Sequence, residues 1–355
     1  MLGSSLGGLL ARRHRRRRGG DDGLGLWPEM AELGLLGLTV PEAGGGGGLG
    51  PSAVAAVGRI LGEQLVPEPF AACAVMPAAV VAALAAGDVR DDLRDALIGG
   101  RERICLAWQT AANQTAAFPA DCRIDADGRL IGVKRFVVAP DRQALVTAMG
   151  ADGPCIVLAD LAGPGVEVET QPTSDGAAYA TLRFKGAVVA SPLITGAEAE
   201  AAMTTAFDHG LLAAAAQLAG LTEGVLTLTL EHLRTRVQFE RPIGSFQALQ
   251  HRAVEMRIRL ALADASVREA ARMLEAEPGS PQASAAASAA KASASAAALA
   301  VCKEAIQMHG AIAFTEESDV GLFARAALKW SSWLGGAREH RRRFVALDGE
   351  LIHGR

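Results

Sequence analysis

The segment 196–355 is rich in alanine and nearly free of proline, and this combination restricts it to long helices. Alanine is the best helix former, whereas proline breaks helix interiors. Even the Ala/Ser run at 283–300 therefore indicates a helix and not a linker. Glycines inside a long helix normally cost stability, so Gly210, Gly220 and Gly224 indicate close helix packing. Apolar spacing predicts four antiparallel helices, which together make a four-helix bundle, at 199–236, 246–276, 281–309 and 319–347.

The preceding residues follow two other patterns. Residues 24–102 predict helices at 27–38, 52–65 and 71–86, with a flexible glycine-rich loop at 44–48. Residues 103–195 contain short, often β-branched runs separated by Gly, Asp and Pro, which predict an antiparallel barrel or sandwich. These runs lie at 104–108, 130–138, 144–149, 155–158, 166–170 and 180–184. We therefore expect an α+β, mainly α chain with an N-terminal helical domain (24–102), a middle antiparallel β-barrel (103–195) and a C-terminal four-helix bundle (196–355).

Composition excludes several classes of protein. Half of the residues are hydrophobic, so the chain is not intrinsically disordered. A net charge of -4 and 4% aromatic residues argue against a nucleic-acid partner. No uninterrupted apolar run reaches the ~18–20 residues of a membrane span. The five cysteines are scattered without a C-x-x-C pair, so they predict neither a disulfide framework nor a metal site, and the expected location is the reducing cytoplasm.

A basic block lies near the N-terminus, at Arg12–Arg18. It follows an apolar stretch, which is the reverse of the order in a secretory signal. We expect residues 1–23 to form a disordered, solvated segment. The alternative is that the block binds an acidic surface.

Two motifs in the expected bundle carry the most specific signal. They are RTRVQFERPIGSFQALQH at 234–251 and QMHGA at 307–311. They resemble the C-terminal signature of the acyl-CoA dehydrogenases, and the order of the three expected domains is that family's order. Residues 35–42 and the following glycines resemble the family's first domain. Sections of the chain also resemble the small subunits of two-subunit bacterial acyl-CoA dehydrogenases that act on dicarboxylic or steroid side-chain acyl-CoAs.

The resemblance implies FAD as the cofactor and assigns residues to it. A guanidinium suits the anionic pyrophosphate, and a Gln amide can bond to phosphate or base. In the family these residues reach across a dimer interface to a neighbour's FAD. The alternative is that Arg236 and Gln307 are ordinary helix-surface residues, and His251 and His309 are expected to be structural. The resemblance assigns Arg236 and Phe239 to the pyrophosphate and adenine side, Phe246 and Gln247 to the adenine, and Gln307 with Gly310 to the pyrophosphate.

The catalytic base that the reaction needs is missing from both positions where the family carries it. Dehydrogenation at Cα–Cβ of an acyl thioester requires a carboxylate to take the α-proton. The usual base position falls on Leu334, in the turn Trp333–Gly336. The alternative position on the first bundle helix falls on Gly210, and its neighbouring substrate-binding Arg falls on Leu211. The carboxylates nearby in sequence are Asp208, Glu223 and Glu339, of which Asp208 and Glu339 are the fallback candidates.

The middle domain also departs from the family pattern. Residues 108–112 replace the family's Thr-Glu-Pro before its flavin loop, and residues 136–138 replace the Trp-Ile-Thr that packs on the flavin ring. The replacements remove the threonine hydroxyls that would donate to the flavin, whereas the backbone of these residues is still able to contact it. Lys134 keeps its family context, and we interpret it as structural.

The lost residues face this chain's own flavin and substrate, and the retained residues face a neighbour's FAD. We therefore expect an FAD-dependent acyl-CoA dehydrogenase subunit that completes the FAD site of a base-carrying homologue. The reaction would convert an acyl-CoA, from fatty acid or steroid side-chain degradation, to the 2-enoyl-CoA, with an electron-transfer flavoprotein as acceptor. The alternatives are a self-sufficient homo-oligomeric dehydrogenase with an unusual base and a non-catalytic scaffold that has lost flavin.

Overall fold

The computed structural model describes residues 25–112, 114–118, 121–173, 175, 177–315 and 317–353. The chain divides into two compact units. The sheet unit comprises Met1–Val54 and Pro67–Gly210, and the bundle unit comprises Ala55–Val66 and Leu211–Arg355. The expected disordered segment 1–23, with its arginine block, lies outside the described residues.

The sheet unit begins with short helices, several of them shorter than expected. The helix expected at 27–38 is only α2 (Trp27–Glu32), because the chain turns at Gly34 with φ 72°. The apolar run at 71–86 forms a π-helical turn, η2 (Ala71–Val75), followed by α4 (Met76–Ala82). Helix α5 (Asp88–Gly99) was not individually expected, and it ends at Gly100 with φ 60°.

The glycine-rich loop at 44–48, which was expected to be flexible, folds back on the chain before it. The loop contains the single 3-10 turn η1 (Glu42–Gly44). Its amides then bond back to the chain before it, with Gly47 N donating to Gly37 O and Gly48 N donating to Val40 O. A Cβ on Gly46 would lie 2.2 Å from Val40 O, so the close packing itself requires glycine there.

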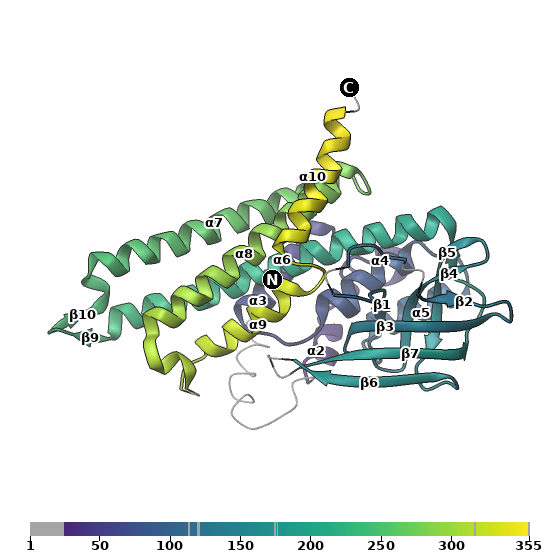
Figure 1. Ribbon diagram of the computed structural model, residues 1–355, viewed down its shortest axis with the longest axis horizontal. Coiled ribbons are helices and arrows are strands. Elements are labelled where there is room, and N and C mark those ends of the chain that lie inside the picture. The colour runs from purple at the N-terminus through teal and green to yellow at the C-terminus, as the bar shows by residue number, and fades with distance from the viewer. Residues whose placement is uncertain are drawn as a thin grey trace. The chain divides into compact units, whose positions relative to one another are not determined.

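The strands of the sheet unit form one mixed sheet. The pairing order is β6-β7-β3-β2-β4-β5-β8, with β1 also paired to β4 (Figure 1). Most pairs are antiparallel as expected, but β1 and β2 run parallel to β4, and the described order has ends at β6 and β8 where a closed barrel would have none. The bounds are β1 Cys105–Ala107, β2 Arg123–Ile124, β3 Arg129–Val138, β4 Gln143–Gly150, β5 Gly153–Asp160, β6 Val166–Pro172, β7 Ala178–Val188 and β8 Ile194–Thr195.

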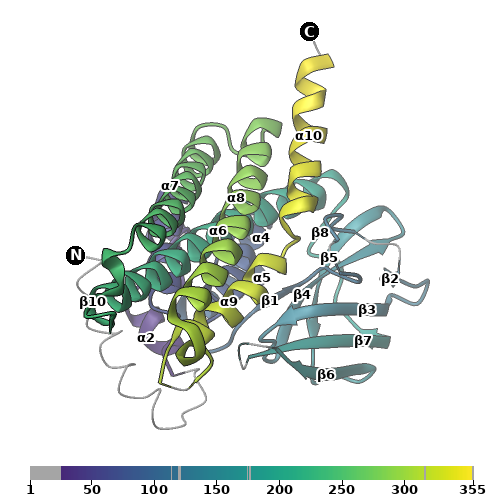
Figure 2. The same cartoon turned by 60° about the vertical axis from the view of Figure 1, so that its left-hand side comes forward.

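The bundle unit is built from long helices close to their expected bounds. Helices α7 and α8 lie side by side in both ribbon views (Figures 1 and 2). The helix expected at 319–347 is interrupted at 333–336, where Leu334 has φ 61° and Gly335 has φ 101°. The bounds are α6 Gly196–Thr235, which begins in the sheet unit, β9 Val237–Gln238, β10 Arg241–Pro242, η3 Ile243–Ser245, α7 Gln247–Ala276, α8 Pro281–His309, η4 Gly310–Phe314, α9 Val320–Ser332 and α10 Ala337–His353.

Close helix packing is confirmed at Gly220 and Gly224 of α6. Helix α3 (Pro51–Glu63) crosses α6 in the bundle unit through glycines four residues apart on each helix. A Cβ on Gly62 would lie 1.9 Å from Gln217 O, and one on Gly220 would lie 1.8 Å from Arg59 O. The two backbones therefore approach to a distance that leaves no room for a side chain.

We expect Gly220→Ala to lower the free energy of unfolding by about 1–3 kcal/mol or more, since overpacking of a tight contact costs that much. Here the clashing atoms are helix backbone, which cannot move aside as a side chain can. Urea unfolding of the full chain measures the effect. The matched control is Gly99→Ala in α5, where the nearest atom to an added Cβ is the Arg101 side chain at 3.7 Å. Equal stability of the two variants would contradict the packing argument.

Two helical segments among the described residues are long and apolar enough to cross a membrane, Gly196–Thr235 and Pro281–Phe314. Their most apolar windows are 83% and 67% buried inside the protein. This burial identifies them as core helices of the fold.

Candidate cofactor and catalytic sites

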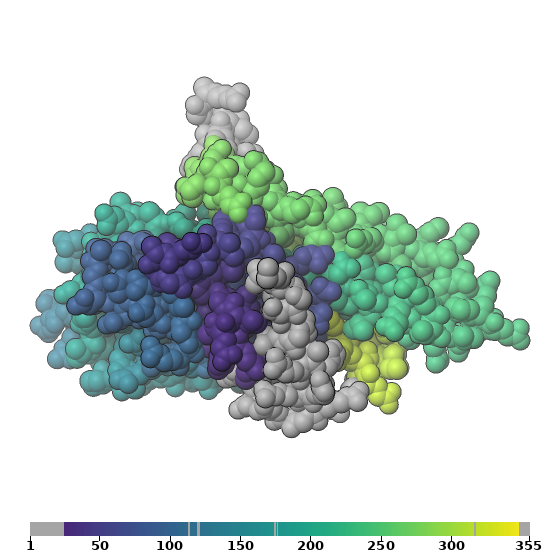
Figure 3. Space-filling model, turned by 180° about the vertical axis from the view of Figure 1, so that it is seen from behind, coloured from purple at the N-terminus to yellow at the C-terminus, as the bar shows by residue number. Residues whose placement is uncertain are grey.

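A short hairpin at one end of the bundle unit presents an exposed aromatic ring. Strands β9 and β10 pair antiparallel, and the two residues between them, Phe239 and Glu240, have φ 53° and 62°. Positive φ at both central residues is the geometry of the tight hairpin turn. It leaves Phe239 85% exposed at the projecting tip of the hairpin, which is labelled in Figure 1 and green in Figure 3. An apolar side chain this exposed, on a backbone that disfavours it, points to a binding role.

Arg241 and Phe246 pack around this ring. The guanidinium carbon of Arg241 lies 4.1 Å from the centre of the Phe246 ring. Phe239 meets Phe246 edge to face, with 6.0 Å between ring centres. Gln247 then begins α7 with an exposed side chain, and the Arg236 side chain is exposed at the end of α6. The structure thus brings together four of the predicted cofactor residues: Arg236, Phe239, Phe246 and Gln247.

The remaining two predicted cofactor residues, Gln307 and Gly310, lie at the end of α8, which contacts the end of α6. His232 of α6 stacks on His309 of α8, with 4.3 Å between ring centres and 22° between planes. The stack holds the end of α6 against the end of α8, and Gln307 and Gly310 belong to that end of α8. The Gln307 side chain is exposed, and Gly310 has φ 67° with open space around it. We call the set Arg236, Phe239, Phe246, Gln247, Gln307 and Gly310 the bundle-end site.

The histidine stack was only partly expected. His309 is structural as expected, since its Nδ1 donates to Ala305 O at 2.9 Å. His232 was missed, because nothing local in the sequence pairs residues 77 positions apart. Burial, His309 and Arg236 together lower the pKa of His232. These neighbours favour the neutral form of the His232 ring, and Arg236 supplies cationic charge just after the end of α6.

The bundle-end site fits FAD approaching from outside the chain. A guanidinium, an amide side chain and an open glycine face solvent together, which suits a pyrophosphate. The exposed Phe239 ring and the half-buried Phe246 ring suit the flat face of an adenine.

No carboxylate occupies either expected base position. The Leu334 side chain is fully buried, in the turn between α9 and α10, and Gly210 is buried inside α6. Both residues are therefore incapable of taking the α-proton of a substrate.

The turn around Leu334 is held by buried polar groups that the sequence did not reveal. Lys291 of α8 is fully buried, and its ammonium donates to Ser331 O at 3.1 Å, Gly335 O at 3.0 Å and Ser295 Oγ at 3.1 Å. His340 Nε2 donates to Leu334 O at 2.9 Å. Burial and the nearby Lys291 charge lower the pKa of His340 to about 3, so its ring is neutral. These bonds fix the backbone on both sides of Leu334.

Lys291 makes the stability of the fold depend on pH. Burial lowers its pKa to about 7, whereas a lysine in an unfolded chain ionises near 10.4. Between these values the unfolded chain binds a proton that the folded chain does not. The free energy of unfolding should therefore rise with pH from about 7 to about 10, by at most about 1.4 kcal/mol per pH unit.

Lys291→Met should reduce this rise in urea unfolding at pH 7, 8 and 9. The buried Lys134 contributes in the same direction, because its pKa is lowered to about 8, so part of the slope remains. Lys303→Met on the exposed side of α8 is the matched control and should leave the slope unchanged. A wild-type slope in the Lys291 variant would contradict this assignment.

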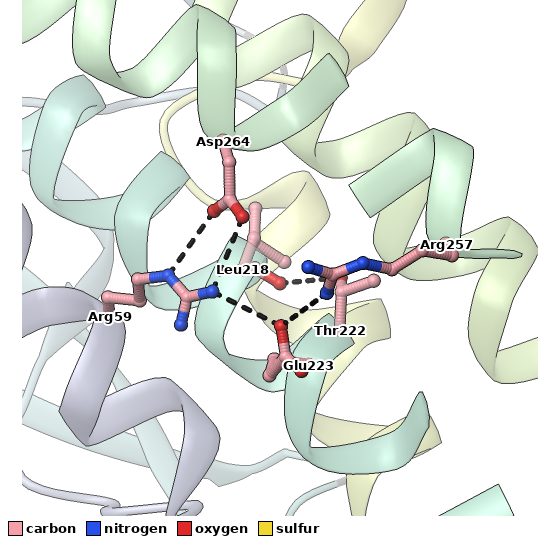
Figure 4. A network of polar contacts seen from close by, with 6 residues as sticks. All are labelled: Arg59, Leu218, Thr222, Glu223, Arg257 and Asp264. Carbon is pink, nitrogen blue, oxygen red and sulfur yellow. Dashed lines mark hydrogen bonds and ion pairs between the residues drawn. The ribbon is translucent and has the colours of Figure 1, made fainter. Parts of the chain in front are cut away.

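The three carboxylates near the base positions in sequence have different surroundings. Glu223 belongs to an ion-pair network in the bundle unit, where it accepts from Arg59 at 3.2 Å and Arg257 at 3.0 Å, and Arg59 also pairs with Asp264 (Figure 4). Asp208 is buried within α6. Glu339 lies next to the turn, with its carboxylate 2.9 Å from the position that a Cβ on Gly336 would take. Of the fallback residues, Glu339 is thus the one that the structure places at the turn.

The residues at 136–138 of the sheet unit, where the family's flavin-ring residues were expected, have packing contacts of their own. Phe136 has φ 57° at an irregularity in the β3–β7 pairing, and its ring meets Tyr179 edge to face at 6.1 Å. Lys134 is fully buried and donates to Trp108 O at 3.2 Å and Thr147 Oγ1 at 2.9 Å. Lys134 therefore has the structural role interpreted from the sequence.

Comparison with known proteins identifies the family. Acyl-CoA dehydrogenase IpdE2 of Mycolicibacterium smegmatis is 31% identical over 322 residues, which cover 90% of this chain and 87% of that protein. This chain belongs to the acyl-CoA dehydrogenase family. Residues 199–348 match the acyl-CoA dehydrogenase C-terminal domain, and residues 10–87 match the N-terminal domain. Acyl-CoA dehydrogenase FadE27 of Mycobacterium tuberculosis is 28% identical over 326 residues, covering 90% of this chain and 86% of that protein.

Solved structures of two-protein complexes share the fold. The Tcur3481–Tcur3483 steroid ACAD variant superposes with a TM-score of 0.86 at 28% identity, covering 99% of this chain and 100% of the compared chain. The ChsE4–ChsE5 complex from Mycobacterium tuberculosis gives 0.83 at 25% identity, covering 98% and 94%. The expected resemblance to two-subunit acyl-CoA dehydrogenases is confirmed.

Proposed function

We infer that this acyl-CoA dehydrogenase family member is the base-deficient subunit of a two-subunit enzyme, in which it completes the FAD site of its partner. The observation that carries this inference is an asymmetry between two sites. The bundle-end site keeps its cation, amides and rings, and most of them face solvent. The turn that would carry the base holds a fully buried leucine instead. Loss of function by random substitution would be expected to remove both the bundle-end residues and the catalytic base.

In this proposal the complex converts an acyl-CoA thioester to the 2-enoyl-CoA in the cytoplasm. FAD, when bound, supplies the hydride acceptor, and this chain's Arg236 and Gln307 hold its pyrophosphate from across the interface. The relatives named as a steroid ACAD and as IpdE2 and FadE27 acyl-CoA dehydrogenases support a steroid side-chain or fatty acyl-CoA as the substrate class. An electron-transfer flavoprotein would reoxidise the flavin.

One observation favours a second candidate, a self-sufficient homo-oligomer. Glu339 lies beside Gly336, in the turn where the family carries its base. Its carboxylate is therefore a candidate for a base in an unusual position. In that case Glu339 would take the α-proton and no partner would be needed.

Co-expression distinguishes these functions. The chain is purified alone and together with a base-carrying acyl-CoA dehydrogenase homologue from the same organism, and bound FAD per chain and oligomeric state are measured. We expect a colourless chain alone and a yellow hetero-oligomer with the partner. A yellow, active homo-oligomer would replace this proposal with the self-sufficient enzyme. If the chain stays colourless in both preparations, or stays monomeric with FAD and the partner present, the proposal is contradicted. The protein would then be a scaffold that has lost flavin.

A further inference from the structure

The loop after β1 is closed around one side chain, that of Gln114. The loop comprises residues 108–112 and 114–117, and we call it the ring loop. The Gln114 Oε1 atom accepts from Thr110 N at 2.8 Å, Ala111 N at 3.2 Å and Thr110 Oγ1 at 3.1 Å. The Nε2 atom of the same carboxamide donates to Trp108 O at 3.5 Å and to Ala116 O. One amide group thus satisfies two backbone donors and two backbone acceptors.

The same groups define what the loop would bind without Gln114. Two adjacent N–H groups converge on one oxygen, and a carbonyl beside them accepts an N–H. This pattern is complementary to a planar edge that carries C=O next to N–H. A carboxamide has that edge, and so has the pyrimidine end of a flavin ring. Ala111 and Ala116 are exposed, so the loop lies at the surface of its unit, where a small molecule has access.

We propose that the Gln114 carboxamide substitutes for a flavin ring in this loop, so that the chain's own ring position is filled by its own side chain. The inference rests on the proposed function, and it gives a structural reason why this chain would not bind a flavin ring of its own. From the sequence alone, the backbone of residues 108–112 was still able to bind a flavin. The structure shows that Gln114 already uses the amides of Thr110 and Ala111.

The rest of the loop is anchored independently of Gln114. Lys134 Nζ also donates to Trp108 O, Arg135 N donates to Gln109 O at 2.8 Å, and Thr147 Oγ1 donates to Ala117 O at 2.8 Å. Removing the Gln114 side chain should therefore free the Thr110 and Ala111 amides without unfolding the loop ends. Gln114 is a positioning residue for the loop and takes no part in the chemistry.

Hydrogen exchange of the full-length chain, without partner, tests the proposal with FMN as the probe. In the wild type, exchange of the Thr110 and Ala111 amides should be slow and unaffected by FMN. In Gln114→Ala these amides should exchange about tenfold faster, since each loses its acceptor, and FMN should slow them again. Gln171→Ala, an exposed glutamine on β6 of the same sheet, is the matched control and should show neither change.

A second variant separates the donor and acceptor halves of the carboxamide. Gln114→Glu keeps an oxygen for both amides but loses the N–H donors, so the amides should remain slow and FMN should have no effect. The proposal is overturned if FMN slows the wild-type loop, if Gln114→Ala leaves exchange unchanged, if the freed loop ignores FMN, or if Gln114→Glu behaves like Gln114→Ala. These outcomes need no partner subunit, so they are independent of the FAD content of the co-expressed complex, which tests the proposed function.

Discussion

The isolated chain is expected to oxidise acyl-CoA thioesters at least about 10²–10⁴-fold more slowly than a base-carrying acyl-CoA dehydrogenase, because that is the usual contribution of a positioned general base. Leu334 and Gly210 occupy the two base positions, and neither side chain accepts a proton. Dye-coupled turnover of a panel of acyl-CoAs by the purified, FAD-supplemented chain measures this directly. Robust turnover without a partner would refute the base-deficient assignment.

Substitutions then distinguish a missing base from a displaced one. If the isolated chain is active, Glu339→Gln and Asp208→Asn should each be tested, and loss of activity in one of them would identify the unusual base. If it is inactive, Leu334→Glu should not restore turnover, because the residue 334 side chain is fully buried and the ring loop is closed by Gln114. A buried carboxylate would also have a raised pKa and would cost stability. Recovery of turnover in Leu334→Glu would show that the turn still faces a bound flavin.

Local signals explain which elements were predictable. Helix α8 has its expected bounds because Ser280 accepts from Ala283 N at 3.1 Å as an N-cap, Pro281 opens the helix, and Gly310 ends it with φ 67°. Each of these is a sequence signal with a known geometry. The glycines of α6 similarly indicated close helix packing, but they did not identify α3 as the helix that packs there.

The features that the sequence missed depend on contacts between distant residues. Lys291 lies in a low-complexity Ala/Ser helix, and its partners Ser331 and Gly335 are 40 and 44 positions away. Apolar spacing continued across the turn at 333–336, whereas the structure breaks the helix there with two left-handed residues. The grouping of the bundle-end residues came from a family resemblance, because periodicity alone does not associate residues on different helices.

Arg236→Ala should weaken FAD retention by the assembled complex about 10- to 150-fold, which corresponds to roughly 1.5–3 kcal/mol for a hydrogen bond to a charged group. The Arg236 side chain is exposed in this chain, so it has no internal packing to lose. The backbone of Arg236 holds the hairpin through bonds from its N–H to His232 O and from Ile243 N to its carbonyl, and both survive the substitution. The loss should therefore appear in FAD affinity and not in folding.

Arg234→Ala is the matched control, since Arg234 is an exposed arginine in the last turn of α6, two residues before Arg236. It removes the same charge from the same helix end but leaves the bundle-end site intact. Fluorescence titration of the apo complex with FAD at two salt concentrations compares the variants. A general electrostatic role predicts equal losses that both disappear at high salt, whereas a direct contact with pyrophosphate predicts a loss confined to Arg236→Ala that persists in salt. Unchanged FAD affinity in Arg236→Ala would remove the main support for a site shared between subunits, because Arg236 is the cation of the bundle-end site.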